Sequence, residues 1–465
     1  MHQHHVTESA YSLVERQAQG KALRQRVPRT SHAQWTKAPD RPDPIETLEQ
    51  TSAGRLPELI PIRYGRMVRS PFTFLRGSAG AMAYDLAATP TTGIRVQLGG
   101  DCHLNNFGAF GTPERNLIFD VMDFDETLPG PWEWDLKRLA ASFVVAGRSI
   151  GAAERDCEEA AVAVARTYRE RLREYAQMRA IEVWYAHIDA TVVMDLARAS
   201  DNRRARQPTL AKARSQVASH IFPRMTELVD GHRRIVDRHP LVFHPKHDDH
   251  FEEEMHTFFK RYRESLSGDR RFLLSRYRIV DVAMKVVGVG SVGTRCAVIL
   301  LLAGDDDPLF LQYKEAGESV LAPYAGKSQY ANQGQRVVAG QRLMQSSSDI
   351  LLGWSSEEGR DFYFRQLRDM KAVINIDGLS ASALIDYGEM CGWALARAHA
   401  KSGDAGLLSG YLGKSDVFDR AIATFARDYA DVTEQDHAAM LTAVKSGRII
   451  VESEEAHVSV AREQT

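Results

Sequence analysis

The chain has 465 residues, of which 44% are hydrophobic and 26% are charged. This balance is typical of folded globular proteins and excludes a largely disordered chain. The 59 Lys and Arg nearly cancel the 61 Asp and Glu, so the overall charge favours neither nucleic acid nor an anionic membrane as the main partner. The four cysteines lack CxxC spacing, which argues against a disulfide framework and against a structural zinc site.

The beginning of the chain is polar. Residues 1–55 are rich in Gln, Arg, His, Thr and Pro, and this composition predicts a flexible N-terminal arm. The first residues, MHQHHVTESAYS, lack the apolar core of a signal peptide. The longest apolar run, residues 296–303, is too short to cross a bilayer. We therefore expect a soluble, cytoplasmic protein.

Residues 56–270 are expected to form two parts of one larger unit. Residues 56–150 mix strand-like runs, such as GIRVQLGG and NLIFDVMDF, with an amphipathic helix for which Asp135 is the expected N-cap. Residues 151–270 are rich in Ala, Glu, Arg and Leu and contain few helix breakers. They are predicted to form a helical subdomain.

Residues 271–465 predict a sheet followed by helices. IVDVAMKVVGVG, TRCAVILLLAG and PLFLQYKEA are strand-like and are separated by short turns, which indicates an antiparallel meander. A helix near residues 334–345 and two more strands, DILLGW and RDFYFRQL, complete the part at 271–370. Residues 371–465 contain a linker and then helices. The fold class is therefore α+β.

Acidic and amide side chains follow two of the early strands. LGGDCHLNNFG presents Asp101, His103 and Asn106, and the strand after it leads to Asp123 and Asp125. Carboxylate and amide oxygens are the ligands that magnesium prefers. A further carboxylate, such as Asp101, can orient a hydroxyl group or accept its proton. This segment therefore predicts a metal site beside a general base.

A glycine-rich turn lies between two of the later strands. GVGSVG contains Gly288, Gly290, Ser291 and Gly293, and backbone N–H groups in such a turn can approach phosphates. The following segment, TRCAVILLL, is strand-like, so a dinucleotide-binding turn that opens a helix is disfavoured. Lys314 lies on the next strand, where its ammonium group can pair with phosphates.

Together these motifs resemble the aminoglycoside and choline kinase branch of the protein-kinase-like superfamily. The Asp-x-His-x-x-Asn pattern, the following IFDVMDFDE and the later GPWEWDLKRLA carry the resemblance. It implies that ATP and Mg²⁺ are bound and that a phosphoryl group is transferred to a small-molecule or protein hydroxyl. It implies these roles: catalysis by Asp101 and His103, metal binding by Asn106, Asp123 and Asp125, bracing of the catalytic loop by Asp135, and nucleotide binding by Gly288, Gly290, Ser291, Gly293 and Lys314.

The order of the motifs is inverted relative to those kinases. In them, the glycine hairpin, lysine strand, helix and two further strands precede the catalytic loop, whereas here they follow it. The resemblance therefore implies a circularly permuted two-lobe kinase-like fold with a five-stranded glycine-rich lobe. The helix after the lysine strand, GQRVVAGQRLMQ, contains no glutamate to pair with Lys314. Four residues remain candidates for that pairing: Glu315, Glu318, Gln335 and Gln341.

The stretch from about Pro57 to Tyr411 also resembles a bacterial family known as domain of unknown function 2252. RYGRMVRSPFTFLRGSA, GDCHLNNFG and GQRLMQSSSDILLGW carry this resemblance. The arginines of the first segment, Arg66 and Arg76 among them, are candidates for binding a phosphate or an acidic substrate. Solvated surface arginines are the alternative interpretation.

Three other functions compete with phosphoryl transfer. A metal-dependent phosphoesterase also uses paired aspartates, but the sequence offers no further histidine ligands of the usual kind. A nucleotide sensor without catalysis would explain the missing glutamate. An adenylyl transferase would bind the nucleotide in the opposite direction. The sequence does not identify the acceptor.

Overall fold

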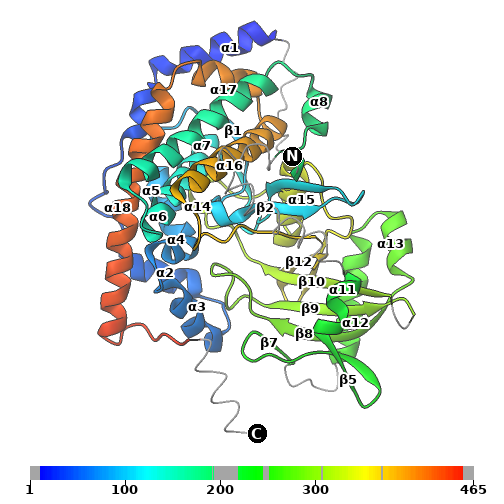
Figure 1. The fold of residues 1–465 in the computed structure, drawn as a ribbon. Coiled ribbons are helices and arrows are strands. Elements are labelled where there is room, and N and C mark those ends of the chain that lie inside the picture. The colour runs from blue at the N-terminus through cyan, green and yellow to red at the C-terminus, as the bar shows by residue number, and fades with distance from the viewer. Residues whose placement is uncertain are drawn as a thin grey trace.

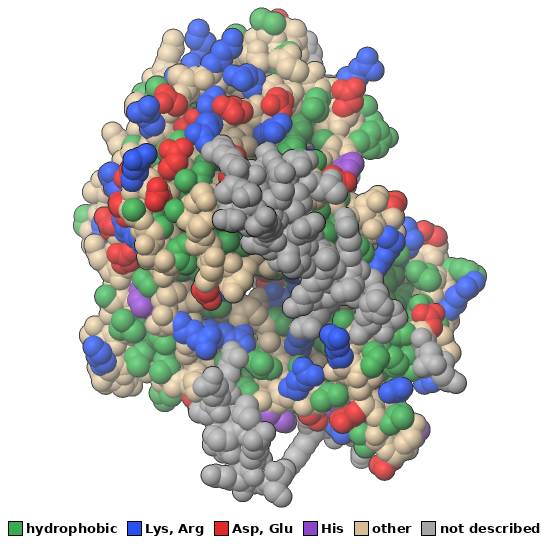
Figure 2. Space-filling model, viewed as in Figure 1, with side chains coloured by type: hydrophobic (Ala, Val, Ile, Leu, Met, Phe, Trp, Pro, Cys, Tyr) green, Lys and Arg blue, Asp and Glu red, His purple; other side chains and the backbone are tan. Residues whose placement is uncertain are grey.

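A computed structural model describes residues 11–190, 192, 218–244, 251–304, 307–367 and 370–453 of the chain. The molecule consists of a mainly helical unit and a second unit built around a six-stranded antiparallel sheet (Figure 1). The α+β class predicted from the sequence is confirmed. Lys and Arg side chains are interspersed with Asp and Glu over the helical unit on the face shown in Figure 2.

The large sheet has the strand order β11-β12-β10-β9-β8-β7. Its strands are β7 (Val242–Phe243), β8 (Arg278–Lys285), β9 (Cys296–Leu302), β10 (Pro308–Ala316), β11 (Gly353–Glu357) and β12 (Arg360–Gln366). The predicted meander is β8, β9 and β10, and the two later strands are β11 and β12. The strand predicted at DILLGW begins only at Gly353. The sixth strand, β7, was not expected.

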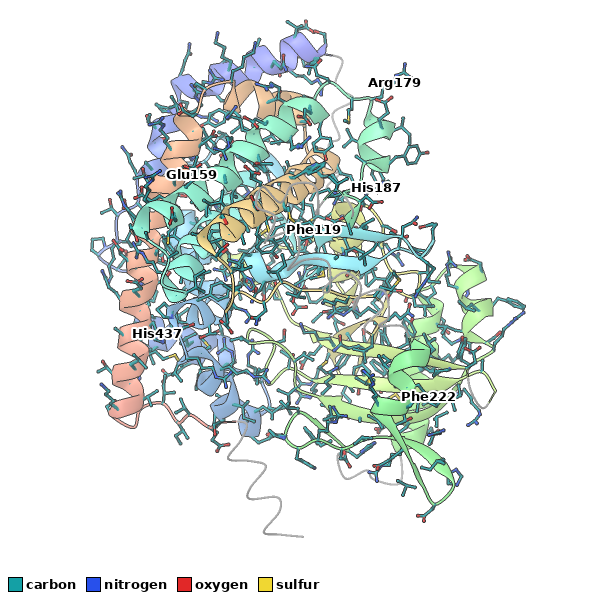
Figure 3. The ribbon with its side chains drawn as sticks, in the orientation of Figure 1. Phe119, Glu159, Arg179, His187, Phe222 and His437 are labelled. Carbon is teal, nitrogen blue, oxygen red and sulfur yellow. The ribbon has the colours of Figure 1, made fainter. Side chains whose placement is uncertain are left out.

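Both faces of this sheet are covered. Its unit also contains the helices α11 (Ala218–Met225), α12 (Phe251–Glu264) and α13 (Gly268–Leu274). Every residue of β9 is buried. Ile299 and Leu301 pack in the apolar cluster with α12, whereas Val298 and Leu300 pack with Phe222 of α11 (Figure 3). Since side chains alternate along a strand, the continuous apolar run of β9 is what a sheet buried on both faces requires.

The predicted helical subdomain at 151–270 is only partly helical. It begins with α7 (Glu154–Tyr175) and α8 (Ala180–Tyr185), but β5 (Thr226–Val229) and β6 (His232–Ile235) then form a hairpin, and β7 joins the large sheet. Asp230 and Gly231, which connect β5 to β6, both have positive φ angles, as two-residue hairpin turns require. This Asp-Gly turn signal was missed. The part of the prediction at 191, 193–217 and 245–250 lies outside the described residues.

The helical unit brings together segments that are far apart in the sequence. Its main helices are α6 (Trp132–Ser149), α7, α16 (Ala381–Ser402), α17 (Ala405–Leu412) and α18 (Val417–Lys445). Helices α7 and α16 are in close contact, since a Cβ atom on Gly392 would lie 2.4 Å from the carbonyl oxygen of Val164. Phe119 packs edge-on against Tyr387 of α16, with 6.1 Å between ring centres (Figure 3). Among the described residues, no helix has the length and apolar content needed to span a bilayer.

The prediction of a flexible arm at 1–55 is wrong for its described part, residues 11–55. This stretch contains α1 (Leu13–Ala22) and α2 (Pro44–Ser52). Helix α1 packs against α17, and Ile45 and Leu48 of α2 are buried. His32 shares a 2.6 Å hydrogen bond with the hydroxyl of Tyr411. The polar composition reflects helices that bury only one narrow face against the rest of the molecule.

The elements that surround the candidate site are short. They comprise the helices α3 (Ile60–Met67), α4 (Pro71–Gly77), α5 (Ala79–Ala87) and α15 (Gln333–Met344), and the two-stranded pairs β1 (Arg95–Leu98) with β4 (Leu128–Pro131) and β2 (Phe107–Gly111) with β3 (Leu117–Val121). The helix predicted near residues 334–345 is α15. It contacts β10, β11 and β12 on one side and α16 on the other, so it links the two units.

Lys137 in α6 makes stability depend on pH. Its side chain is fully buried, its ammonium group has no hydrogen-bond partner among the described residues, and burial lowers its pKa to about 7. In the unfolded chain a lysine keeps its proton up to pH ~10.4, so the unfolded state binds more protons between pH 7 and 10, and the free energy of unfolding rises with pH there. We expect the wild type to gain about 1 kcal/mol per pH unit relative to Lys137→Met. Urea unfolding at pH 7, 8 and 9 measures this, and parallel pH profiles would contradict it.

Candidate functional site

The segment with Asp101, His103 and Asn106 forms a compact loop between β1 and β2. The backbone N–H of His103 donates to the carbonyl oxygen of Asp101 at 2.9 Å. The side-chain amide of Asn106 donates to the same oxygen at 2.6 Å. These bonds hold the three side chains in one turn, and the hairpin of β2 and β3 then leads to Asp123. We refer to residues 99–106 as the catalytic loop, after the role that the sequence resemblance implies for it.

Asp135 holds the start of this loop. Its carboxylate accepts the backbone N–H groups of Gly99, at 2.7 Å, and Gly100, at 3.0 Å. His399 of α16 lies 3.3 Å from the same carboxylate. The position is that of the brace predicted from the sequence. The prediction that Asp135 is a helix N-cap is wrong, because α6 begins at Trp132 and Asp135 lies inside its first turn.

Arg138 pairs with Asp101. The Nε of Arg138 donates to Oδ1 of Asp101 at 2.8 Å, and its Nη2 contacts the same oxygen. Nη2 also donates to the carbonyl of Leu75 at 2.9 Å. The Asp101 side chain remains 20% exposed, and its second oxygen accepts no hydrogen bond from the described residues. Arg138 follows Asp135 by three residues on α6, and helix geometry places such pairs on one face. This three-residue spacing was the signal by which the sequence could have placed Arg138 at the site.

His103 lies beside Asp101 but is neutral. Its Nε2 is 3.7 Å from Oδ2 of Asp101, and its ring packs edge-on against Phe72. Burial, together with the positive charges of Arg76 and Arg138, lowers the pKa of His103 well below its usual value. The geometry therefore favours a packing role for this ring in the catalytic loop.

The glycine-rich turn between β8 and β9 lies over the catalytic loop. Gly288 and Gly293 have φ angles of 64° and 87°, which glycine adopts without strain. A Cβ atom on Gly290 would lie 3.3 Å from the carbonyl oxygen of Arg76 and 3.9 Å from Oδ2 of Asp101. Arg66, a predicted substrate contact, donates instead to the carbonyl of Gly288. We call residues 288–293 the glycine loop.

Lys314 of β10 is buried and pairs with Asp125. Its ammonium group contacts Oδ2 of Asp125, and this carboxylate also accepts hydrogen bonds from Tyr363, at 2.8 Å, and Ser291, at 3.0 Å. Burial alone would raise the pKa of Asp125, but the Lys314 ammonium lowers it to about 2. The carboxylate in turn raises the pKa of Lys314 against the effect of burial. Both groups are therefore charged at neutral pH.

Asp125 is therefore the partner of Lys314, in place of the four candidates that the sequence left open. Glu315 instead forms ion pairs with Arg295, at 3.3 Å, and Arg360, at 3.0 Å. Helix α15 supplies Arg336, which donates to the backbone carbonyls of Asp125 and Thr127. The sequence predicted that Asp125 binds the metal. Because its carboxylate already accepts from three donors, Asn106 and Asp123 are more available as oxygen ligands.

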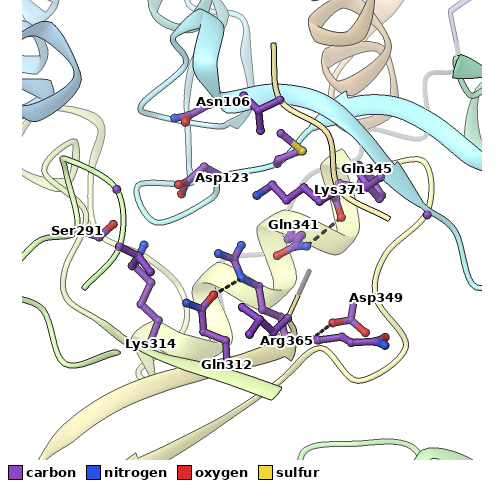
Figure 4. A pocket seen from close by; sticks show the side chains of 18 of the residues that line it. Asn106, Asp123, Ser291, Gln312, Lys314, Gln341, Gln345, Asp349, Arg365 and Lys371 are labelled. Carbon is purple, nitrogen blue, oxygen red and sulfur yellow. Dashed lines mark hydrogen bonds between the residues drawn. The ribbon is translucent and has the colours of Figure 1, made fainter. Parts of the chain in front are cut away.

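A cavity of about 600 Å³ lies between the sheet and the catalytic loop. Asn106, Asp123, Gly288, Ser291 and Lys314 all line it (Figure 4). A second cavity of about 80 Å³ adjoins it and is lined by Asp101, His103, Asp125 and Gly290. Five residues line both cavities: Arg76, Asn106, Asp123, Gly288 and Ser291. Of the predicted site residues, Asp135, Gly293 and Arg66 line neither cavity, although each supports a loop that does.

The larger cavity contains cations that the sequence did not suggest. Lys285, Arg365 and Lys371 line it, and Arg365 donates to Gln312 at 3.1 Å (Figure 4). Burial and the nearby Arg365 lower the pKa of Lys371 to about 8, so this lysine is mainly charged at pH 7. Arg365 lies on β12 two residues after Tyr363, and strand alternation places both side chains on one face. The lining as a whole suits an anionic ligand.

A family model described as "Uncharacterized protein conserved in bacteria (DUF2252)" matches residues 55–443. The chain belongs to this DUF2252 family. No curated protein and no solved structure matches the chain. The membership confirms the family resemblance found in the sequence, and the kinase-like resemblance remains a prediction.

Asn106 and Asp123 are the residues here that fit magnesium. Burial and the neighbouring Asp125 raise the pKa of Asp123, as expected for a carboxylate that would gain from a cation beside it. Magnesium usually takes one or two carboxylates and fills its remaining positions with water and phosphate oxygens. Among the described residues, no group of three or more His, Cys, Asp or Glu side chains is arranged to hold a metal. The donor set therefore fits a metal that arrives with a phosphate ligand better than a two-metal hydrolytic centre.

Proposed function

We propose that this protein is an ATP- and magnesium-dependent phosphotransferase that acts on a hydroxyl group. One observation carries the proposal. A single cavity of about 600 Å³ collects a glycine loop, a buried lysine and an Asn–Asp pair. These groups suit phosphates and the metal that accompanies them, and phosphoryl transfer needs mainly positioning and charge stabilisation.

We further propose that the fold is kinase-like and circularly permuted. The order of elements supports this: β8, the glycine loop, β9, the lysine strand β10, α15, β11, β12, a linker and α16 follow one another. This is the order expected from the resemblance, with the catalytic loop placed before it in the chain. Chemistry depends on the arrangement in space, so the inverted chain order does not weaken the functional proposal.

In this proposal the residues have distinct roles. Lys314 and the N–H groups of the glycine loop bind phosphate oxygens of ATP. Asn106 and Asp123 would hold magnesium, which when bound neutralises charge on the phosphates. The free oxygen of Asp101 orients the acceptor hydroxyl and takes its proton. Since Asp125 pairs with Lys314, ATP phosphates have to share this lysine with the carboxylate or displace the carboxylate from it.

Calorimetric titration of ATP into the purified protein, with and without magnesium, tests the proposal. We expect magnesium-dependent binding that weakens by about tenfold or more in Lys314→Ala and Asp123→Asn, because each loses a charged contact to the phosphates or to their metal. Lys260→Ala removes an exposed lysine of α12 and serves as the matched control. Absence of ATP binding in the wild type would refute the proposal.

A second candidate, adenylyl transfer, is favoured by the distribution of cations. Lys285, Arg365 and Lys371 surround the part of the cavity near β12 and the linker, where a nucleotide bound as in the kinases would place its uncharged base. A reversed nucleotide would place its phosphates there instead. ATP labelled at either the α or the γ phosphate separates the two reactions by which label reaches the product. A sensor without catalysis would transfer neither label.

A further inference from the structure

The small cavity beside Asp101 is enclosed by the N-terminal helices. Its volume is about 80 Å³, and its walls come from the glycine loop, the catalytic loop and three arginines, Arg55, Arg63 and Arg76. Arg63 lies on α3 and Arg76 on α4, whereas Arg55 follows α2. Of the three, only Arg76 also lines the larger cavity. Asn106, Asp123, Gly288 and Ser291 also line both cavities, so the space lies next to the proposed base and adjoins the proposed nucleotide site.

None of these three arginines has an ion-pair partner among the described residues. Arg63 is 1% exposed, and its guanidinium donates only to the Ser52 hydroxyl and the Gly77 carbonyl. Arg55 donates only to the carbonyls of Thr51 and Val292. Arg76 makes no hydrogen bond within the described part of the chain, and its buried Nε is without a partner. Burial lowers the pKa of Arg55 and of Arg76, and carboxylates that line the cavity oppose this only from beyond ion-pair distance.

The carboxylates of the small cavity are mostly engaged elsewhere. Asp101 pairs with Arg138, and Asp125 pairs with Lys314. Glu126 accepts the backbone N–H of Val320 at 2.7 Å. Asp123 is the remaining carboxylate, and it is the proposed magnesium ligand. A buried cation without a counter-ion is costly, so an anion in this space would relieve that cost.

We propose that this cavity binds an anionic group of the acceptor, so that the acceptor is a small molecule with a phosphate or carboxylate near its reacting hydroxyl. The inference rests on the proposed phosphotransferase function. Guanidinium groups bind both kinds of anion through paired hydrogen bonds. A space of about 80 Å³ admits one such group, because a water molecule occupies roughly 30 Å³ of liquid.

The reaction step follows from this placement. With its anionic group held by the arginines, the acceptor presents its hydroxyl to the free oxygen of Asp101. The hydroxyl oxygen forms a bond to the γ phosphorus of ATP, and the bond from that phosphorus to the bridging oxygen of the β phosphate breaks. The hydroxyl proton passes to Asp101, and ADP leaves with the bond's electron pair.

Inorganic phosphate is the probe for this site. We expect it to bind the full-length protein in calorimetric titrations, both alone and in the presence of saturating magnesium and a non-hydrolysable ATP analogue. Arg76→Ala should weaken phosphate binding by about tenfold or more, because it removes the arginine with the most free donors. Arg69→Ala is the matched control, since Arg69 is an exposed arginine of the same segment that lines neither cavity. Unchanged thermal unfolding midpoints would show that both variants fold.

The possible results separate this inference from the proposed function. Phosphate that binds together with the ATP analogue and depends on Arg76 supports the acceptor site. Phosphate that is displaced by the analogue but not by ADP would show that the arginines bind the γ phosphate, and this would overturn the inference. Failure of phosphate to bind, with ATP binding intact, would overturn the inference alone. Phosphate binding without any ATP binding would refute the phosphotransferase, and the acceptor role with it.

Discussion

Replacing Asp101 with Asn should lower phosphoryl transfer by about 100-fold to 10,000-fold, the usual contribution of a general base. The amide has the shape of the carboxylate but cannot take the proton of the acceptor hydroxyl. ATP binding should change little, because Asp101 lines the small cavity and not the larger one. Release of labelled γ phosphate, to water or to an acceptor, measures the first effect, and ATP calorimetry measures the second.

The Asp101→Asn variant needs a check on structure. Asn leaves Arg138 without its counter-ion, because the amide is neutral, although its oxygen can still accept from the two nitrogens that contact Oδ1 of Asp101. The thermal unfolding midpoint therefore has to be compared with that of Asp269→Asn, which changes an exposed side chain of α13. A folded Asp101→Asn protein that transfers phosphate at the wild-type rate would rule out the role assigned to this residue.

Replacing Asp120 with Ala should lower the free energy of unfolding by about 3–5 kcal/mol, as expected when a buried ion pair loses one partner. Asp120 on β3 and Arg397 on α16 are both fully buried and lie 2.9 Å apart. Asp120 also accepts the backbone N–H and the hydroxyl of Ser346, each at 2.9 Å. The substitution therefore leaves a buried guanidinium without its counter-ion and two donors of Ser346 without an acceptor. Urea unfolding measures the loss.

A matched control for Asp120 is available on α18. Asp428 pairs with Arg427, and both side chains are 41% exposed. Exposed pairs contribute about 0–1 kcal/mol, so Asp428→Ala should have little effect. Replacing Arg397 by Met together with Asp120→Ala should recover part of the loss, since no charge is then left buried. A loss below about 1 kcal/mol in Asp120→Ala would contradict the assigned role of the pair.

The sequence predicted the elements whose patterns are local and strong. The apolar run of β9, the strand-like run of β10 and the long apolar face of α16 can be recognised without reference to the rest of the chain. The helices at residues 13–22 and 44–52 were missed because their stability comes from packing on α17 and α18 and their composition is polar. The hairpin of β5 and β6 was missed because its short strands are largely exposed and only the Asp-Gly turn marks them.

For the candidate site, the sequence identified the loops that carry the site residues better than it identified which residues pair with one another. Asp123, Ser291 and Lys314 line one cavity, as their motifs predicted. The partner of Lys314 was sought on the following helix, whereas Asp125 supplies it from nearly two hundred residues earlier in the chain. Contacts between such distant segments leave no local pattern. Arg63 likewise gives no sign in the sequence that it is buried.

The way the two units interleave along the chain has a consequence for synthesis on the ribosome. All six strands of the large sheet lie between residues 242 and 366, so this unit can form as soon as that stretch has emerged. Helix α7 ends at Tyr175, but α16, which packs against it, begins only at Ala381. The apolar surface that α7 buries against α16 therefore has no native cover until the last fifth of the chain is made. We expect α7 to depend on a chaperone or on temporary contacts during that interval.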